Sequence, residues 1–462
     1  ILVSTGTYVE NLIWNEKIIS IISEEGAEST TIDGSATNPV ITISNVGNNV
    51  SGIYEGLLNG FTIKNGLTSV NQNAGGGGLS LSFSYITIAN VIIEENQGDE
   101  WTGWGLDIRR AAGIGIQHSS PLIKHSTIRN NQGVGIKTLT VSTPVLRDVT
   151  IAYNEGKAIE ILGNGIKLDS CKIIYNQNGG VWYDQSEAVG FDSSIVNNTL
   201  FYKNGSSDSE VGAFHYTLAL GNLEINNCTF YNNFNQLQIG QDLYSLGTSW
   251  WGASAGGNNI QVQNSIFVND SSSENTSIFV VQNAFPDTLQ LSHCLFSFED
   301  SLGENDSVNY YDMSENIYGQ APLFCNPHND DYTVAENSPA IGSGENGGNI
   351  GVFGVGCDAI NLTIGKDVLP LHYILHQNYP NPFNPITTLR YELPEDTFVK
   401  LTIYDILGNV VNNLIQINQS SGYKSLQWNA TNGYGQSVSA GVYIYKIEAG
   451  GFVDTKKMIL LK

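Results

Sequence analysis

The chain has 462 residues, 44 acidic against 20 Lys and Arg side chains, a formal net charge of −24 and a charged fraction of only 14%. This acidity argues against nucleic acid as a partner, because phosphate binding requires patches of Lys and Arg. A hydrophobic fraction of 41% argues against a disordered chain. No apolar run of about 18 residues is present, so we expect no membrane span.

The charge is distributed unevenly. Residues 1–359 hold 37 acidic and 12 basic side chains, a net charge of −25, whereas residues 360–462 hold 7 acidic and 8 basic ones, a net charge of +1. Five prolines between residues 370 and 394 mark the same region with turns. We therefore expect two domains, 1–358 and 375–462, joined by a linker over 359–374. The chain begins at Ile1 inside an apolar strand without a Met or a signal peptide, and we expect that an upstream segment was removed or is not recorded.

A short theme, an apolar alternation followed by Asn and Gly, recurs through the first 300 residues. A sequence pattern that recurs at intervals of a few tens of residues indicates a solenoid or a propeller. The alternation has a period of two residues, which is typical of strands, and no helical stretch interrupts it. The shortest repeat is too short for a four-stranded propeller blade but suits three short strands, so we predict a parallel β-helix. The anchoring asparagines lie 31, 35, 23, 22, 28, 29 and 36 residues apart, at positions 65, 96, 131, 154, 176, 204, 233 and 269.

Aligned repeats give two columns of residues that should point into the core, because residues two apart on a strand share a face. We expect each asparagine to end a strand at a turn, where Asn tolerates the left-handed conformation and its side chain can join a hydrogen-bonded ladder. The first column holds Ser126, Val149, Cys171, Cys228, Ser265 and Cys294, and the second holds Ile128, Ile151, Ile173 and Phe230.

Residues 1–358 resemble secreted right-handed parallel β-helix proteins, the class that includes pectate-lyase-like folds. The resemblance rests on the opening residues 1–11, on Thr31-Ile32-Asp33-Gly34, on the repeats, and on the closing segments 338–342 and 349–351. It implies an all-β solenoid. Such proteins usually begin with an amphipathic capping helix that this sequence lacks, so we expect the first rung to be exposed or to be covered by a segment outside this sequence.

Residues 375–462 resemble the C-terminal sorting domains of the type IX secretion system, which are related to immunoglobulin-like domains of flagellar hook-capping proteins. The matching segments are 377–385, 387–391, 399–405, Trp428, 440–443 and 456–462. The resemblance implies a small antiparallel β-sandwich, contact with the type IX secretion machinery, and export to the outside or the outer-membrane surface of a Gram-negative bacterium. An alternative is an immunoglobulin-like adhesion module.

The five cysteines fall into two groups. Cys171, Cys228 and Cys294 lie in the inward column, which predicts buried thiols that act as small apolar side chains. Cys325 and Cys357 flank the closing segment and could form a disulfide, which suits an oxidising compartment. No spacing of Cys and His indicates zinc.

Four long repeats carry extra residues after the Asn-x-Gly turn, at about 98–117, 179–193, 205–222 and 236–259. Insertions at one corner should emerge along one edge of the solenoid, where repeat proteins often bind ligands. Exposed aromatic rings suit sugar rings, although packing of these loops onto the solenoid is the alternative. The ligand-binding candidates are Trp101, Trp104, Trp182, Tyr183, Trp250 and Trp251.

Catalysis by a β-helix lyase would need a basic residue to remove a proton and a cation to neutralise a uronate. Our catalytic candidates are Asp107, Arg109, Lys167 and His215, with Arg110, His118, Lys157, Glu160 and Asp184 nearby in sequence. The Asn-Thr-Asp, Gly-His-Gly and Arg-Ile-Lys motifs of β-helix polygalacturonases are missing. Ca²⁺ is the one cofactor that the sequence suggests, through oxygen-rich stretches at 299–306 and 329–331.

These observations leave three functions open. The first is binding of an extracellular glycan or another cell-surface component through the loop edge. The second is a polysaccharide lyase or glycoside hydrolase on the same scaffold. The third is a structural subunit that self-associates head to tail through its first rung. The excess of negative charge favours neutral glycans, or contacts through Ca²⁺ or the few basic residues.

Overall fold

The computed structural model describes residues 1–47, 53–68, 75–98, 111–184, 193–206, 209, 211–217, 222–235, 241–247, 259–268, 277–282, 288–297, 302–303, 309–312, 315–360, 373–378 and 381–461. The chain divides into two compact units, Ile1–Ile360 and Asn361–Lys462.

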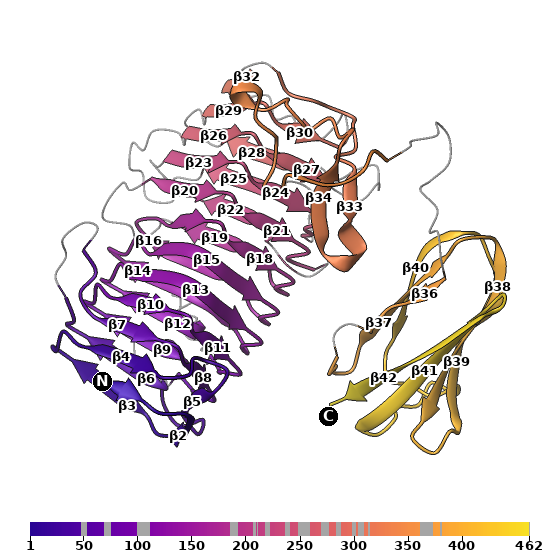
Figure 1. Cartoon of the computed structure of the whole chain (residues 1–462), viewed down its shortest axis with the longest axis horizontal. Helices are drawn as coiled ribbons and strands as arrows, with labels where there is room; N and C mark the ends of the chain where they lie inside the picture. The colour runs from indigo at the N-terminus through magenta and orange to yellow at the C-terminus, as the bar shows by residue number, and fades with distance from the viewer. Residues whose placement is uncertain are drawn as a thin grey trace. The chain divides into compact units, whose positions relative to one another are not determined.

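The first unit is a parallel β-helix, as predicted (Figure 1). A typical rung contributes two short strands to a 21-stranded sheet and one strand to an 11-stranded sheet. In one rung these are β10 (Thr87–Ala89), β11 (Ile92–Glu94) and β12 (Ala111–Gln117). Every pairing within the two sheets is parallel, so each strand stacks on its counterpart one turn later.

The 21-stranded sheet also contains β1 (Leu2–Val3), β2 (Gly6–Val9), β4 (Ser20–Ser23), β5 (Thr30–Asp33), β7 (Leu57–Asn59), β8 (Thr62–Lys64), β13 (Leu122–Arg129), β15 (Val145–Ala152), β17 (Lys167–Asp169), β18 (Lys172–Ile174), β20 (Ser194–Asn197), β21 (Leu200–Tyr202), β23 (Asn222–Asn226), β24 (Thr229–Tyr231), β26 (Asn259–Gln263), β27 (Ile266–Val268), β29 (Thr288–Ser292), β30 (Leu295–Phe296) and β32 (Asn309–Asp312). The 11-stranded sheet also contains β3 (Leu12–Asn15), β6 (Ile41–Ser44), β9 (Leu79–Ser82), β14 (Val134–Thr140), β16 (Ile159–Gly163), β19 (Val181–Asp184), β22 (Phe214–Thr217), β25 (Leu243–Gly247), β28 (Ile278–Gln282) and β31 (Leu302–Gly303).

Strands of the smaller sheet occupy segments that the sequence had assigned to inserted loops. β12, β19, β22 and β25 lie inside the four predicted insertions, so those assignments were wrong in part. Aromatic residues at these strands suggested exposed loops, but alternate residues face the core. In three of these strands a glycine or alanine comes just before the apolar residue that starts the inward alternation, as in Gly180-Val181 of β19 and Ala213-Phe214 of β22, whereas β25 has Asp242 at this position.

Both predicted core columns are confirmed. Ser126 pairs with Val149, and Ile128 pairs with Ile151, which continues to Ile173. The second column then becomes a stack of rings whose neighbouring centroids lie 4.8, 4.8, 4.9 and 5.1 Å apart. Its members are Phe201, Phe230, Phe267, Phe296 and Tyr318. The spacing follows from the strand separation of a sheet, about 4.8 Å.

A ladder of buried asparagines closes the turn after the second strand of each rung. Asn96, Asn131, Asn154, Asn176 and Asn204 each donate through Nδ2 to Oδ1 of the next asparagine, at 2.9–3.0 Å. The ladder ends at Asn233, which donates to the buried Asp242 at 3.1 Å. Each Nδ2 also donates to a backbone carbonyl of the preceding rung, as Asn176 does to Ile151 at 3.0 Å.

Two details of the predicted ladder need correction. Gly66, not Asn65, is the counterpart of Asn96, because Lys64 pairs with Glu94. The left-handed residue is also not the ladder asparagine but the residue before it, such as Glu95 (φ 56°), Tyr153 (φ 57°) or Lys203 (φ 49°). Strand pairing decides the first point and the backbone φ angles decide the second, and the sequence alone shows neither. Asn269 lies outside the described residues.

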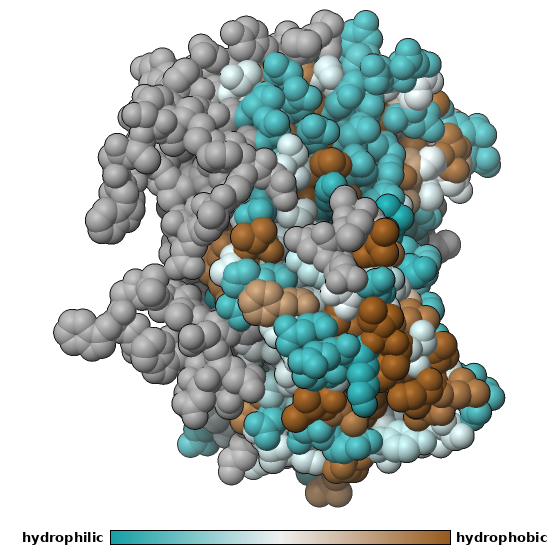
Figure 2. Space-filling view, turned by 90° about the vertical axis from the view of Figure 1, so that its left-hand side faces the viewer, coloured by the Kyte–Doolittle hydropathy of each residue, from teal (hydrophilic) through white to brown (hydrophobic). Residues whose placement is uncertain are grey.

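The first rung presents apolar side chains to solvent. Ile1, Leu2, Val9 and Ile13 are 70%, 66%, 67% and 81% exposed. Figure 2 shows apolar surface low on the face in view, where the first rungs lie.

The solenoid unit closes with β33 (Phe324–Asn326), the 3₁₀ helix η1 (Pro327–Asn329), β34 (Asp331–Ala335), the 3₁₀ helix η2 (Glu345–Gly347) and β35 (Val355–Cys357). The strands form a three-stranded sheet in the order β33-β34-β35. Tyr332 of β34 packs against Tyr202 and Tyr231, with ring centroids 5.0 and 5.8 Å apart. The segment therefore covers apolar residues on the outside of the larger sheet.

The second unit contains two antiparallel sheets around their own core, as expected for a small sandwich. One sheet has the order β36-β37-β40 and the other β39-β38-β41-β42. Trp428 is 1% exposed and packs against Phe383 and Tyr443. The strands are β36 (Ile374–Leu375), β37 (Thr387–Leu393), β38 (Thr397–Asp405), β39 (Val410–Gln419), β40 (Gly422–Trp428), β41 (Gly441–Ala449) and β42 (Phe452–Leu460).

The ladder predicts a strong effect of Asn176→Ala on stability. The substitution removes an acceptor for Asn154 and a donor to Asn204, and leaves their buried polar groups without these partners. We expect the free energy of unfolding to fall by about 2–5 kcal/mol, measured by urea denaturation. Asn222→Ala, at an exposed strand position, is the control and should change it by less than about 0.5 kcal/mol. Equal effects of the two substitutions would contradict a stabilising ladder.

The buried thiols predict slow chemical modification. Burial raises the pKa of Cys171 and of Cys228 to about 12, above the usual thiol value near 8.5. Since the thiolate is the reactive form, we expect no labelling of Cys171, Cys228 or Cys294 by iodoacetamide at pH 8 in the folded protein. All three should be labelled after unfolding in urea, as mass spectrometry would show. Rapid labelling of the folded protein would contradict their burial.

Candidate ligand-binding site

Five residues form a continuous row on the smaller sheet. Lys137, Glu160, Trp182, His215 and Tyr244 are matched one to one across β14, β16, β19, β22 and β25. They point away from the core because the residue that precedes each of them belongs to the core cluster. Those core residues are Ile136, Ile159, Val181, Phe214 and Leu243.

The row begins with a buried ion pair. Lys137 Nζ lies 3.2 Å from Glu160 Oε1, and the two side chains are 2% and 1% exposed. Glu160 Oε2 has no hydrogen-bond partner within the described part of the structure. A charge removed from water is costly unless it is paired, so Lys137 and Glu160 depend on each other. Neither side chain is exposed enough to serve as a contact surface.

The row continues with three partly exposed rings, Trp182, His215 and Tyr244, which we call the ring row. Lys157 Nζ lies 3.9 Å from the centroid of the Trp182 ring, a cation–π contact that fixes the position of this ring. His215 packs on Tyr244 with centroids 4.7 Å apart and planes inclined by 52°. The ring row therefore combines apolar ring surface with N–H and O–H groups on three adjacent strands.

Only some of the sequence-predicted residues come together here. Trp182 and His215 are neighbours on the smaller sheet. Lys167 lies on β17 in the larger sheet, exposed, so the structure does not join Lys167 and His215 into one catalytic group. The remaining predicted positions lie outside the described residues: Trp101, Trp104, Asp107, Arg109, Trp250 and Trp251.

Tyr183 is not available to a ligand, contrary to the sequence-based expectation. Its side chain is 0% exposed and stacks on Tyr216 in the core, with ring centroids 4.8 Å apart, while its hydroxyl donates to the Asn164 carbonyl oxygen. Trp182 and Tyr183 are consecutive residues of a strand, so they must face opposite sides of the sheet. Conversely, Lys137 was missed, because its role is visible only from its pairing with Glu160.

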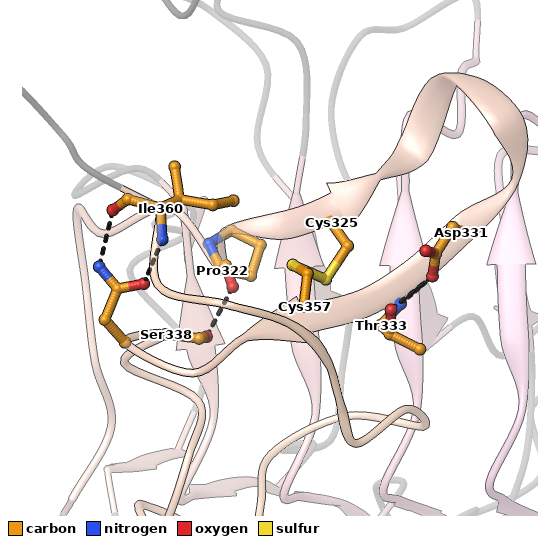
Figure 3. The surroundings of a disulfide bond; sticks show 8 residues. Pro322, Cys325, Asp331, Thr333, Ser338, Cys357 and Ile360 are labelled. Carbon is orange, nitrogen blue, oxygen red and sulfur yellow. Dashed lines mark hydrogen bonds between the residues drawn. A yellow bond between two sulfur atoms is a disulfide. The ribbon is translucent and has the colours of Figure 1, made fainter.

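Cys325 and Cys357 are joined by a disulfide in the closing segment (Figure 3). The bond links β33 to β35, the two outer strands of the three-stranded sheet. Ser338 Oγ donates to the Pro322 carbonyl oxygen at 2.6 Å, and Asn337 exchanges two hydrogen bonds with the backbone of Ile360. These contacts hold the end of the first unit in place.

The acidic residues of this segment have local partners. Asp330 accepts hydrogen bonds from Tyr332 and Tyr175, and Asp331 accepts from Thr333. In the described ranges, no group of three or more His, Cys, Asp or Glu is arranged to hold a metal ion. Likewise, no helix in the part of the chain that the structure describes is long and apolar enough to cross a membrane.

The comparisons with known proteins address both units. The family model described as a right-handed β-helix region matches residues 100–217, and the one described as a secretion system C-terminal sorting domain matches residues 377–461. A search of curated proteins found no match. Among solved structures, the crystal structure of dimeric latent PorU from Porphyromonas gingivalis shares 27% identity over 19% of this chain and 9% of that chain, with a TM-score of 0.17.

The β-helix family model matches part of the unit that the structure shows to be a parallel solenoid, and the sorting-domain model matches the second, antiparallel unit. A sorting domain of this kind directs a protein through the type IX secretion system. The chain therefore carries a right-handed β-helix region, matched over residues 100–217, and a type IX C-terminal sorting domain, matched over residues 377–461, and it is a secreted or outer-membrane-surface protein.

Proposed function

We propose that the protein binds polysaccharide outside the cell through the ring row of its smaller sheet. The observation that carries this proposal is the alignment of Trp182, His215 and Tyr244 on adjacent strands, all partly exposed on one face. Sugar rings present apolar C–H faces edged by hydroxyls. Aromatic rings with nearby hydrogen-bonding groups complement both parts.

The spacing of the ring row favours a polymer over a single sugar. Adjacent strands lie about 4.8 Å apart, so the three rings extend over about 10 Å along the solenoid axis. The rings are also held before any ligand arrives: Lys157 packs on Trp182, and His215 packs on Tyr244. Groups that are ordered in advance lose less conformational entropy on binding.

Export supports an extracellular ligand. The sorting domain brings the β-helix to the cell exterior, where polysaccharides are abundant polymers. Next to the ring row, Lys137 and Glu160 form a buried ion pair, so these two charges are not offered to a ligand. Neutral glycans therefore suit the ring row better than charged ones.

Trp182→Ala tests the proposal. The substitution removes an aromatic surface and the partner of Lys157, and we expect binding of neutral glycans to weaken about tenfold. A glycan array would select the ligand, and isothermal titration calorimetry would measure its affinity, with released sugar assayed in parallel to detect turnover.

Phe83→Ala is the matched control, because Phe83 is a 53% exposed aromatic residue outside the ring row. It should leave the affinity unchanged, and circular dichroism should show that both variants are folded. Unchanged binding by Trp182→Ala, or no binding of any neutral glycan by the unmodified protein, would refute the proposal.

A further inference from the structure

A second surface of the solenoid gathers positive charge. Lys124, Arg147, Lys167 and Lys172 lie on β13, β15, β17 and β18, on three consecutive rungs of the larger sheet. We call these four residues the basic patch. Each points outward, because the neighbouring residue on its strand belongs to the core. Those core neighbours are Ile123, Leu146, Leu168 and Ile173.

Strand pairing brings the basic patch together. Lys124 is directly opposite Arg147. Lys167 is opposite Val145, two residues before Arg147 on β15, and Lys172 is opposite Thr150, three residues after it. Since paired strands lie about 4.8 Å apart and residues rise about 3.3 Å along a strand, the four side chains originate within about 15 Å of one another.

The basic patch is unusual because none of its four side chains forms an ion pair within the described residues. Three other basic residues of the solenoid do form ion pairs: Lys64 pairs with Glu95, Arg129 with Glu94, and Lys137 with Glu160. Within the described residues, none of the four side chains of the basic patch forms an ion pair or a hydrogen bond. All but the half-buried Lys124 are exposed.

Two carboxylates adjoin Arg147, those of Asp148 and Asp169, but neither forms an ion pair with it within the described residues. Asp148 Oδ2 lies 2.8 Å from Nδ1 of His125. Asp169, which is opposite Arg147 on the next strand, accepts a hydrogen bond from Asn198 at 2.9 Å instead of pairing with the guanidinium. The positive charge of Arg147 does extend to Tyr54: burial raises the pKa of this tyrosine, and Arg147 lowers it in part.

A solenoid unit with a net charge of −25 repels anions in general. With only 12 basic side chains before residue 360, four unpaired ones on three consecutive rungs of the larger sheet form a local exception. Along the solenoid axis the basic patch ends at uncharged residues on both sides. Ala89 is opposite Lys124 on the preceding rung, and Ile195 is opposite Lys167 on the following rung. The charges of the basic patch are spread along the axis, which suits a polymer with repeated anionic groups better than a single small anion.

We propose that the basic patch is a second glycan-binding site, which takes anionic polysaccharides, with carboxylate or sulfate groups, along the outside of β13, β15, β17 and β18. The site is separate from the ring row, which lies on the smaller sheet. The two proposals can therefore be tested independently of each other.

The test compares two variants of equal charge in the full chain. The patch variant carries Lys124→Gln, Arg147→Gln, Lys167→Gln and Lys172→Gln, and glutamine keeps the polar character of these surface positions. The control variant carries Lys17→Gln, Lys424→Gln, Lys456→Gln and Lys457→Gln, which lower the net charge equally but lie outside the basic patch. Circular dichroism would verify that both are folded.

Binding is measured by affinity electrophoresis against polygalacturonate, dextran sulfate and unmodified dextran, over a series of NaCl concentrations. We expect the unmodified protein and the control variant to bind one or both anionic polymers, more weakly as salt rises. The patch variant should bind at least about tenfold more weakly. Comparison of the first two polymers tells carboxylate from sulfate recognition.

Three results would overturn the proposal: no binding of either anionic polymer by the unmodified protein, equal losses in both variants, or equal binding by the patch variant and the unmodified protein. Trp182→Ala, measured against the same anionic polymers, should bind normally, which separates this site from the ring row.

Discussion

The asparagine ladder is the interaction on which the rest of the solenoid depends. Strand pairing and side-chain stacking join the rungs, and a parallel strand that slips by one residue would turn its core residues outward. The ladder opposes such a slip, because each amide must meet both the next asparagine and a backbone carbonyl of the preceding rung. Both surfaces that we describe rely on this register, since each is a set of residues aligned from rung to rung.

The sequence predicted correctly those features that each rung repeats in its own local pattern. The alternation at Ser126 and Ile128 predicted the core columns, because every rung repeats the same local rule. The segments after residue 377 identified the sorting domain, because their characteristic residues are local in the sequence. Where rungs differ in length, this reasoning failed: the strand of Trp182 and Tyr183 was taken for a loop.

Neither candidate surface could be found from sequence alone. Lys137 and Glu160 are 23 residues apart, and nothing in their local sequence shows that they share a buried pair. Lys167 was identified as a candidate, but for catalysis, because its neighbours Lys124 and Arg147 come from other rungs. Net charge also conceals such a site, since it averages a small cationic surface into a large acidic one.

The direction of the ladder has an evolutionary consequence. Every internal asparagine accepts from the rung before it and donates to the rung after it. Whole turns are therefore interchangeable units: duplication or deletion of one turn would rejoin the same donor to the same acceptor, and nearest-neighbour stacking would be restored. The solenoid can thus become longer or shorter when the gene gains or loses the sequence of a single rung. The number of side chains that one face presents to a long polymer changes with the length of the solenoid.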